Sequence, residues 1–278
     1  MKIAHYKRTK IASAPDELVN AINKYTPHKA ELFHNIIPRE KFDIVHLHNR
    51  VMPIKGNKKV IQYHSEPNMV DLTTNIPGLV IAQYHATLRE YSKCNIVRNI
   101  IDFNQQLYDP NIVTNKIRIG FSPSRKKKFG KWHNKGFDET SAILMQIQRD
   151  YPDVEVDIIT DVPLDECLIR KNNCNIIIDE CVTSSYHRSG LEGLALGKLT
   201  ICSIDDKVDK VLKDSSGSDV NPFENIWINQ LRLELSKIID FGGIDFILER
   251  GKESRRWIEE YWQPEQVINE YIKIYENL

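Results

Sequence analysis

The stretch NIIIDECVTSSYHRSGLEGLALGKLTIC, residues 175–202, decides the fold because it contains two short strands with a helix between them. Ile176–Asp179 is an apolar, β-branched run that is too short for a helix and typical of a buried parallel strand. Ser189–Lys198 then reads as a helix that leads into the strand Thr200–Cys202. In an open α/β sheet, ligands bind at the carboxyl ends of the strands, where the next helix offers N–H groups and a partial positive charge. The stretch therefore predicts a phosphate-binding corner.

Two residues of this helix bear directly on a ligand. Gly190 has no side chain, so the backbone can approach a ligand closely there. Glu192 lies about one turn into the helix, and two interpretations of its carboxylate stay open. It accepts hydrogen bonds from a ribose diol, or it is an acidic residue of the first turn that complements the helix dipole.

Short apolar strands alternate with helices along the rest of the chain, and this alternation predicts parallel sheets. Tyr108–Asn111 is polar and reads as a linker, which places a domain boundary near residue 112. An apolar stripe from Val267 to Tyr275 predicts a C-terminal helix that runs to Leu278. Further strands are expected at residues 2–6, 30–33, 43–47, 59–63, 79–82, 116–121 and 154–159, and further helices at 13–24, 138–150 and up to 172.

Composition narrows the function classes. The 38 basic and 38 acidic residues cancel, which argues against general electrostatic capture of DNA or anionic lipid. The apolar stretches are too short to span a bilayer and the N-terminus lacks a signal-peptide pattern, so a cytoplasmic protein without a transmembrane segment is expected. The five cysteines contain no Cys-x-x-Cys pair, which favours reduced thiols over a zinc cluster. No Gly-x-Gly-x-x-Gly follows a predicted strand, which disfavours a dinucleotide-dependent oxidoreductase.

The most basic stretch of the chain is RKKKFGKWHNK, residues 125–135. Three interpretations of it stay open. It is a solvated loop, a phosphate-binding loop that ends at Lys135, or a nucleic-acid contact in which Phe129 and Trp132 stack on bases.

Histidines and other polar residues follow several N-terminal strands, where the carboxyl ends of parallel strands converge. His46 and His48 lie two residues apart, so their side chains share one face of a strand. Three interpretations of these residues, together with His64 and His85, stay open. They bind a metal, they contact an acceptor or donor sugar, or they only stabilise loops. We favour contacts with an acceptor or a donor sugar over a metal site. The expected acceptor-binding residues are His46, His48, Asn49, His64, Tyr84 and His85.

The C-terminal half resembles the nucleotide-sugar domain of the GT-B glycosyltransferases, and among them the retaining family-four enzymes. The likeness rests on the order of strands and helices and on Leu191–Lys198, a segment that in this family usually reads Leu-Glu-Ala-Met-Ala-x-Gly-Lys-Pro. The resemblance implies an α/β protein with two Rossmann-like domains whose parallel sheets face a central cleft. Residues 1–112 would form the acceptor domain and 113–255 the nucleotide-sugar domain. The helix in 256–278 crosses back to the first domain or packs on its own.

The same resemblance implies transfer of a sugar from a nucleotide diphosphate to a hydroxyl acceptor, with retention of configuration and without a metal or other cofactor. It assigns Glu192 to the ribose, and Lys135 and the amides of Ser189–Leu191 to the diphosphate. One position departs from the family, because Ser184 stands where a second glutamate is common, so His187 or Arg188 is expected to hold the sugar or its phosphate instead.

The acceptor stays open among a glycan, a lipid-linked saccharide, a protein and a modified DNA base, and a non-catalytic sugar-nucleotide-binding module is the alternative function. Replacing Glu192 or Lys135 is expected to change activity but hardly stability. The candidate catalytic residues are Lys135, Arg188 and His85. The candidate donor-binding residues are Ser122, Ser124, Lys135, Val162, Tyr186, His187, Arg188, Ser189, Gly190, Leu191 and Glu192.

Overall fold

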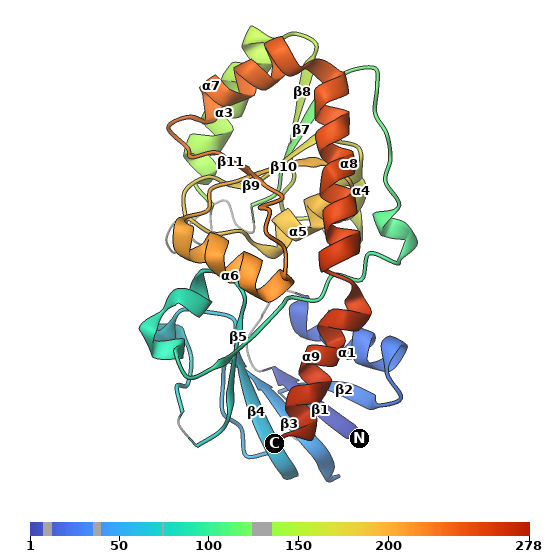
Figure 1. Cartoon of the computed structure of the whole chain (residues 1–278), viewed down its shortest axis with the longest axis vertical. Coiled ribbons are helices and arrows are strands. Elements are labelled where there is room, and N and C mark those ends of the chain that lie inside the picture. The colour runs from blue at the N-terminus through green and yellow to red at the C-terminus, as the bar shows by residue number, and fades with distance from the viewer. Residues whose placement is uncertain (8–12, 36–39, 74, 124–134) are drawn as a thin grey trace. The chain divides into compact units, whose positions relative to one another are not determined.

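The computed structural model describes residues 1–7, 13–35, 40–73, 75–123 and 135–278 (Figure 1). The chain divides into two compact units. The first contains Met1–Asp102, Asp214–Ser216 and Trp262–Leu278, and the second contains Phe103–Lys213 and Gly217–Tyr261.

The first unit is built on a six-stranded parallel sheet with the strand order β2-β1-β3-β4-β5-β6. Ala4, Val45, Ile61 and Val80 from four of its strands are buried in one apolar cluster. Three short 3₁₀ helices follow β4 and β5, at Pro67–Met69, Tyr84–Thr87 and Arg89–Tyr91. The strands are β1 (Lys2–Lys7), β2 (Lys29–His34), β3 (Phe42–His48), β4 (Gly56–Tyr63), β5 (Gly78–Ile81) and β6 (Asn95–Val97), and the helix between the first two is α1 (Ala14–Tyr25).

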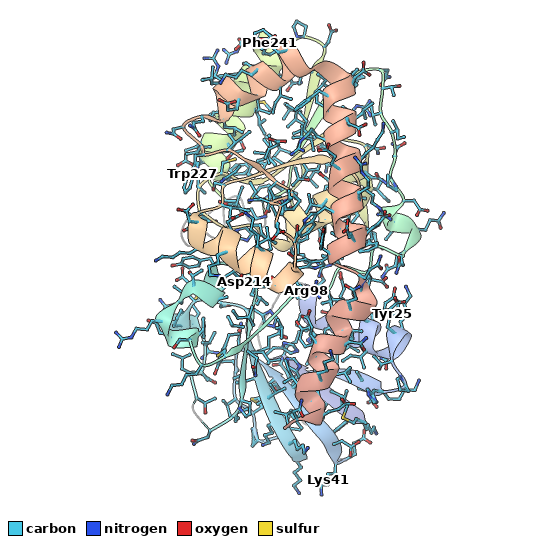
Figure 2. The ribbon with its side chains drawn as sticks, in the orientation of Figure 1. Tyr25, Lys41, Arg98, Asp214, Trp227 and Phe241 are labelled. Atoms are coloured by element: carbon cyan, nitrogen blue, oxygen red, sulfur yellow. The ribbon has the colours of Figure 1, made fainter. Side chains whose placement is uncertain are left out.

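The helix α9 (Pro264–Glu276) belongs to the first unit, although it is far from that unit in sequence. It packs on α1 and β6, and the Tyr271 hydroxyl donates a hydrogen bond to the Arg98 carbonyl at 2.9 Å. The Arg98 guanidinium, labelled in Figure 2, is ion-paired with Glu270 of the same helix. The Trp262 indole N–H donates to the Asn99 carbonyl at 2.8 Å. The expected return of a C-terminal helix to the first domain is therefore confirmed.

The helix starts later than the residue 256 expected from sequence, because Trp257–Tyr261 still belong to the preceding helix, α8 (Gly243–Tyr261). Pro264 explains the break between α8 and α9. A proline has no N–H to donate and disfavours a helical conformation in the residue before it, so it interrupts a helix but suits the first turn of a new one.

The second unit is built on a five-stranded parallel sheet with the strand order β11-β10-β9-β7-β8. Its strands are β7 (Ile117–Phe121), β8 (Val154–Ile158), β9 (Ile176–Glu180), β10 (Leu199–Cys202) and β11 (Glu224–Asn225). The helices of this part of the chain are α3 (Phe137–Asp150), α4 (Leu164–Asn172), α5 (Arg188–Ala195), α6 (Asp206–Ser216), α7 (Leu231–Lys237) and α8; a 3₁₀ turn, Gln106–Tyr108, comes before the sheet, and a π-helical turn, Ile238–Gly242, links α7 to α8.

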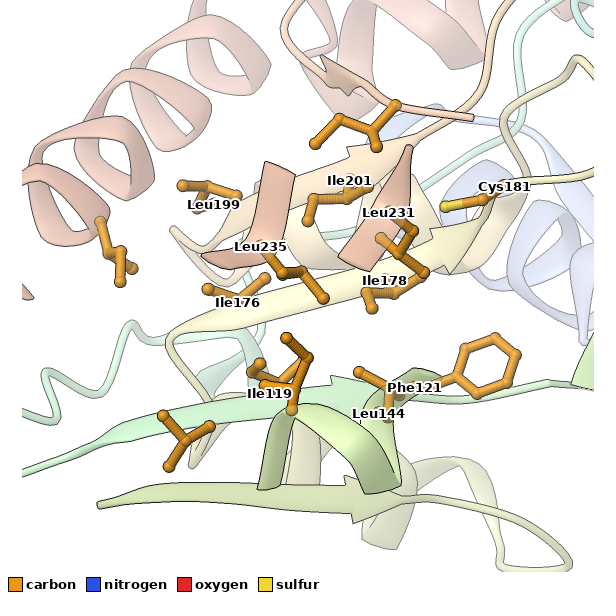
Figure 3. Close-up of a cluster of buried hydrophobic side chains, with 14 residues drawn as sticks. Ile119, Phe121, Leu144, Ile176, Ile178, Cys181, Leu199, Ile201, Leu231 and Leu235 are labelled. Atoms are coloured by element: carbon orange, nitrogen blue, oxygen red, sulfur yellow. The ribbon is translucent and has the colours of Figure 1, made fainter. Parts of the chain in front are cut away.

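Strand β9 lies between β10 and β7, and all five of its residues are buried, which suits the apolar run Ile176–Ile178 at its start. Ile176 and Ile178 pack in one cluster with Leu199 and Ile201 of β10, and Leu231 of α7 joins them (Figure 3). Burial of each such side chain contributes about 1.5–3 kcal/mol. This cluster holds the carboxyl end of β9 in place, and the parallel sheets expected from the alternating pattern are confirmed.

The first unit ends at Asp102, earlier than the boundary near residue 112 that the sequence indicates. The residues in between are tied to the second unit by hydrogen bonds. The Asn172 side chain donates to the Asp109 carbonyl at 2.7 Å, and the Arg255 guanidinium donates to the Tyr108 carbonyl at 3.1 Å. Among the described helices, none is long and apolar enough to cross a membrane.

Candidate functional site

Asp179 organises the corner between β9 and α5. Its side chain is fully buried, and its two carboxylate oxygens accept hydrogen bonds from the Lys135 ammonium at 2.6 Å and from the His187 backbone N–H at 2.5 Å. Burial by itself would raise the pKa of Asp179, but the charges of Lys135 and His187 outweigh it and hold the pKa below its ordinary value. A Cβ atom on Gly190 would lie 2.8 Å from the same carboxylate. Asp179 therefore fixes Lys135 and the start of α5 together.

Glu192 is held by two cations. Its carboxylate accepts hydrogen bonds from the Lys171 ammonium at 2.6 Å and from the Arg188 guanidinium at 2.9 Å, and only 4% of the residue is exposed. Burial would raise its pKa, but Lys171 and Arg188 outweigh that effect and lower it. The carboxylate is thus ionised and fully engaged, which differs from the free, crevice-facing group expected from sequence.

Lys171 is the residue of this corner that sequence reasoning missed. It lies in the last turn of α4, is 1% exposed, and also donates to the Ser189 hydroxyl at 2.9 Å. Burial would lower the pKa of Lys171, but Glu192 outweighs burial and raises it. A signal was present in the sequence, because Lys171 falls on the same helix face as Leu164 and Leu168, where an apolar residue is the rule.

The burial of these ion pairs argues against the expectation that replacing Glu192 or Lys135 hardly changes stability. Removing one member of a buried ion pair leaves the charge of the other without a partner, and this lowers the free energy of unfolding by several kcal/mol. The resulting destabilisation must be separated from any loss of activity.

Three other donor candidates, Ser122, Ser189 and Val162, lie at the ends of strands and helices of the second unit. The Ser122 and Ser189 hydroxyls lie 2.9 Å apart, at the carboxyl end of β7 and in the first turn of α5. Val162 is partly exposed just before α4. Ser124 lies outside the described residues, as do residues 125–134 of the basic stretch.

Three of the expected donor contacts are already engaged within the protein. The Tyr186 ring is fully buried and stacks on Phe223 with ring centroids 5.6 Å apart, so it braces the corner from inside. The N–H groups of Gly190 and Leu191 donate to the His187 carbonyl at 3.1 and 3.4 Å, so they are already used as the helix begins. The phosphate contacts expected from these amides are therefore replaced by contacts within the helix.

Glu180 secures the loop that follows β9. Its carboxylate accepts hydrogen bonds from the N–H groups of Val182 at 2.9 Å and Thr183 at 2.5 Å, and from the Ser203 hydroxyl at 3.1 Å. Burial, and then the neighbouring charge of Asp179, raise the pKa of Glu180 to about 7.

A raised carboxyl pKa makes stability depend on pH. The unfolded chain releases this proton near pH 4.5 and the folded chain near pH 7, so the stabilisation is complete below pH 4.5 and is lost as the pH rises through 7. Between about pH 5 and about pH 8 we expect wild type to lose about 3 kcal/mol more than Glu180→Gln. Urea unfolding of both proteins at the two pH values measures this difference, and parallel pH profiles would contradict it.

His46 and His48 lie on the same face of β3, but inside the first unit rather than at its surface. His46 and His48 are both 0% exposed, so contact with an acceptor through these rings is wrong. The His46 Nδ1 atom shares a hydrogen bond with the Tyr275 hydroxyl at 2.6 Å, and His48 Nδ1 with His64 Nε2 at 2.9 Å. Tyr271 and Tyr275 of α9 cover the His46 ring.

Of the other acceptor candidates, His64 and Tyr84 are partly exposed, and His85 is buried. Burial, and then the nearby His85, lower the pKa of His64 to about 3. The Asn49 side chain is also buried; its carbonyl oxygen accepts the His64 backbone N–H at 2.7 Å. His64, His85 and Asn49 therefore form a connected group at the ends of β3, β4 and β5.

No family model matches the sequence, and no curated protein matches it. Solved structures match in fold over nearly the whole chain. A glycosyltransferase from Rickettsia africae ESF-5 has a TM-score of 0.66 at 12% identity and covers 99% of this chain and 98% of its own. Anabaena Alr3699/HepE, solved in complex with UDP-glucose, has a TM-score of 0.66 at 10% identity, with 100% of both chains covered. The chain has the GT-B fold.

A third GT-B structure supports the same conclusion. Sucrose-phosphate synthase from Thermosynechococcus elongatus has a TM-score of 0.65 at 12% identity and covers 99% of this chain and 98% of its own. The GT-B fold accounts for the two Rossmann-like units with parallel sheets. At these identities the likeness establishes the fold, and the activity has to be argued from the residues.

Proposed function

We propose that this GT-B protein is a glycosyltransferase that moves a sugar from a nucleoside diphosphate to a hydroxyl acceptor. The observation that carries the proposal is the buried charged corner at the carboxyl end of β9. There, the three cations Lys135, Lys171 and Arg188 outnumber the two carboxylates that they contact, Asp179 and Glu192. An excess of positive charge beside the first turn of α5 suits a diphosphate. A protein of the same fold, Alr3699/HepE, was solved with UDP-glucose.

The proposed chemistry rests on charge that is already in place before the reaction. Negative charge grows on the diphosphate as the glycosidic bond breaks, and fixed positive groups stabilise that charge without reorganising. Lys135 is held by Asp179, and Arg188 is held by Glu192, so neither side chain has to be ordered when the donor binds. These cations supply what a divalent ion supplies in other sugar transferases, and we therefore propose a metal-independent transfer.

Glu192 is proposed to accept a hydrogen bond from the ribose diol in addition to those from Lys171 and Arg188. Its carboxylate has two oxygens, each of which can accept more than one hydrogen bond, so a ribose hydroxyl can join Lys171 and Arg188. Ser122 and Ser189 add hydroxyl groups beside it. Retention of configuration, and contacts from the partly exposed His64 and Tyr84 to the acceptor, belong to the same proposal.

A donor screen tests the proposal. The purified protein is mixed with UDP-, GDP-, ADP- and TDP-sugars, and both the melting temperature and the release of free sugar are measured. A ligand that binds only the folded protein raises the melting temperature, so one donor should do so and be slowly hydrolysed. A shift without sugar release, even with acceptors present, would favour a sugar-nucleotide-binding module. No shift with any donor would contradict both functions.

A further inference from the structure

Three histidines of the first unit form a compact cluster far from the α5 corner in sequence. His5 comes from β1, and His46 and His48 come from β3; all three are 0% exposed. One ring nitrogen from each lies within 4.8 Å of the others. The three ring centroids form a triangle, 4.6 Å from His5 to His46, 4.5 Å from His46 to His48 and 5.4 Å from His5 to His48.

The sheet itself brings these rings together. Strands β1 and β3 are neighbours, and His5 is paired with His46 in their parallel register. His48 lies two residues after His46, so its side chain points to the same face of the sheet. The rings therefore sit on rigid central strands rather than on loops, which fixes their spacing.

Two of the rings are oriented by partners outside the cluster. His46 Nδ1 shares a hydrogen bond with the Tyr275 hydroxyl, and His48 Nδ1 shares one with His64 Nε2. The His48 Nε2 atom shares a hydrogen bond with His5 Nδ1 at 3.2 Å, and the Nε2 atom of His46 is left without a partner in the described part of the chain. Histidines that bind metals usually have the second ring nitrogen fixed by such an outer partner.

The cluster contains a buried polar atom whose hydrogen-bonding capacity is not used within the part of the protein that the structure describes. The Nε2 atom of His46, the ring nitrogen left over beside its bond to Tyr275, is buried and has no hydrogen-bond partner among the described residues. A buried polar atom without a partner costs about 1–3 kcal/mol.

We propose that His5, His46 and His48 bind one Zn²⁺ ion. Tetrahedral zinc with Zn–N bonds of about 2.0–2.1 Å places two ligand nitrogens about 3.3 Å apart. His48 Nε2 and His5 Nδ1 are already 3.2 Å apart, and the His46 nitrogen has to close the remaining distance. A ligand set of imidazoles favours zinc and its first-row neighbours over Mg²⁺ or Ca²⁺.

The ion would stabilise the first unit, and three protein ligands leave it one further coordination position. Lys7 is a positively charged residue near His48, and its ion pair with Asp16 offsets the repulsion it would exert on a bound cation. The site lies in the first unit and does not depend on the proposed sugar transfer, so either proposal can fail alone.

The test uses the full chain without an affinity tag. After chelator treatment, the protein is equilibrated with Zn²⁺ or Co²⁺, passed through gel filtration, and analysed for metal content and visible absorption. We expect one equivalent of zinc per chain and the strong visible bands of four-coordinate cobalt. A folded protein that retains no metal, or that gives only the weak bands of six-coordinate cobalt, overturns the proposal.

Variants locate the ion. His5→Gln and His48→Gln should each lower zinc affinity by at least about a hundredfold, because each removes a ligand. His34→Gln, at an exposed histidine outside the cluster, is the control and should bind zinc like wild type. If the ligand variants do not fold, Tyr275→Phe removes only the hydroxyl that orients His46 and should lower affinity about 10-fold or more. Unchanged zinc binding in Tyr275→Phe and the folded ligand variants would overturn the assignment.

Discussion

Replacing Lys171 with methionine is expected to lower the free energy of unfolding by about 3 kcal/mol. The ammonium and its partner Glu192 are both almost completely buried, so the substitution leaves a carboxylate inside the protein without its closest cation. Breaking a buried pair costs about 3–5 kcal/mol, and Arg188 still contacts Glu192, which favours the lower figure. Urea unfolding at neutral pH, with the slope of the transition checked for constancy, measures the loss.

A double variant separates the stranded charge from the lost packing. Lys171→Met combined with Glu192→Gln removes both charges and should recover most of the stability, because no uncompensated carboxylate remains. An exposed pair gives the matched control. Arg232 and Asp150 are well exposed, and Arg232→Met should cost less than about 1 kcal/mol. If Lys171→Met costs no more than that control, the buried pair does not stabilise the corner as argued.

The second large effect is on turnover. Lys135→Met should lower kcat with the donor identified by the screen about 100-fold or more, because it removes a positioned charge from the leaving diphosphate. Removing one positioned donor at a developing negative charge typically costs about 100- to 1000-fold. Single-turnover kinetics with saturating donor measures the chemical step separately from donor binding.

The control for this variant must deal with Asp179, which Lys135 neutralises inside the protein. The single substitution is expected to destabilise the second unit as well. Lys135→Met with Asp179→Asn removes both charges and should restore stability while turnover stays low. Recovery of turnover in this double variant would show that Lys135 acts only on stability and would remove it from the proposed chemistry.

The sheets were predictable from sequence because each signal for them is local. The apolar run of β9 and the glycine-containing start of α5 specify a buried strand and a helix without reference to the rest of the chain. The alternation of strands and helices then implies parallel sheets. These local signals place Asp179, Lys135 and Glu192 near one another but leave their partners undefined.

The partners could not be predicted because they come from distant segments. Lys171 reaches Glu192 from another helix, and Tyr275 reaches His46 from α9. The period of two along β3 shows that His46 and His48 share a face but not which face it is, and that face proved to be covered. His5 was missed because its role depends on the register between β1 and β3, which no short pattern reveals.

Helix α9 has a consequence for the order in which the protein folds during synthesis. The first unit is completed by residues 262–278, which the ribosome adds after the whole of the second unit. The Tyr271 hydroxyl accepts a hydrogen bond from Gln62, and the Tyr275 hydroxyl shares one with His46, so these two side chains of the sheet lack those partners until then. During synthesis, the β1–β6 sheet therefore lacks its C-terminal helix until the chain is complete. Residues 103–261 can fold before that helix is made, although they emerge after the sheet.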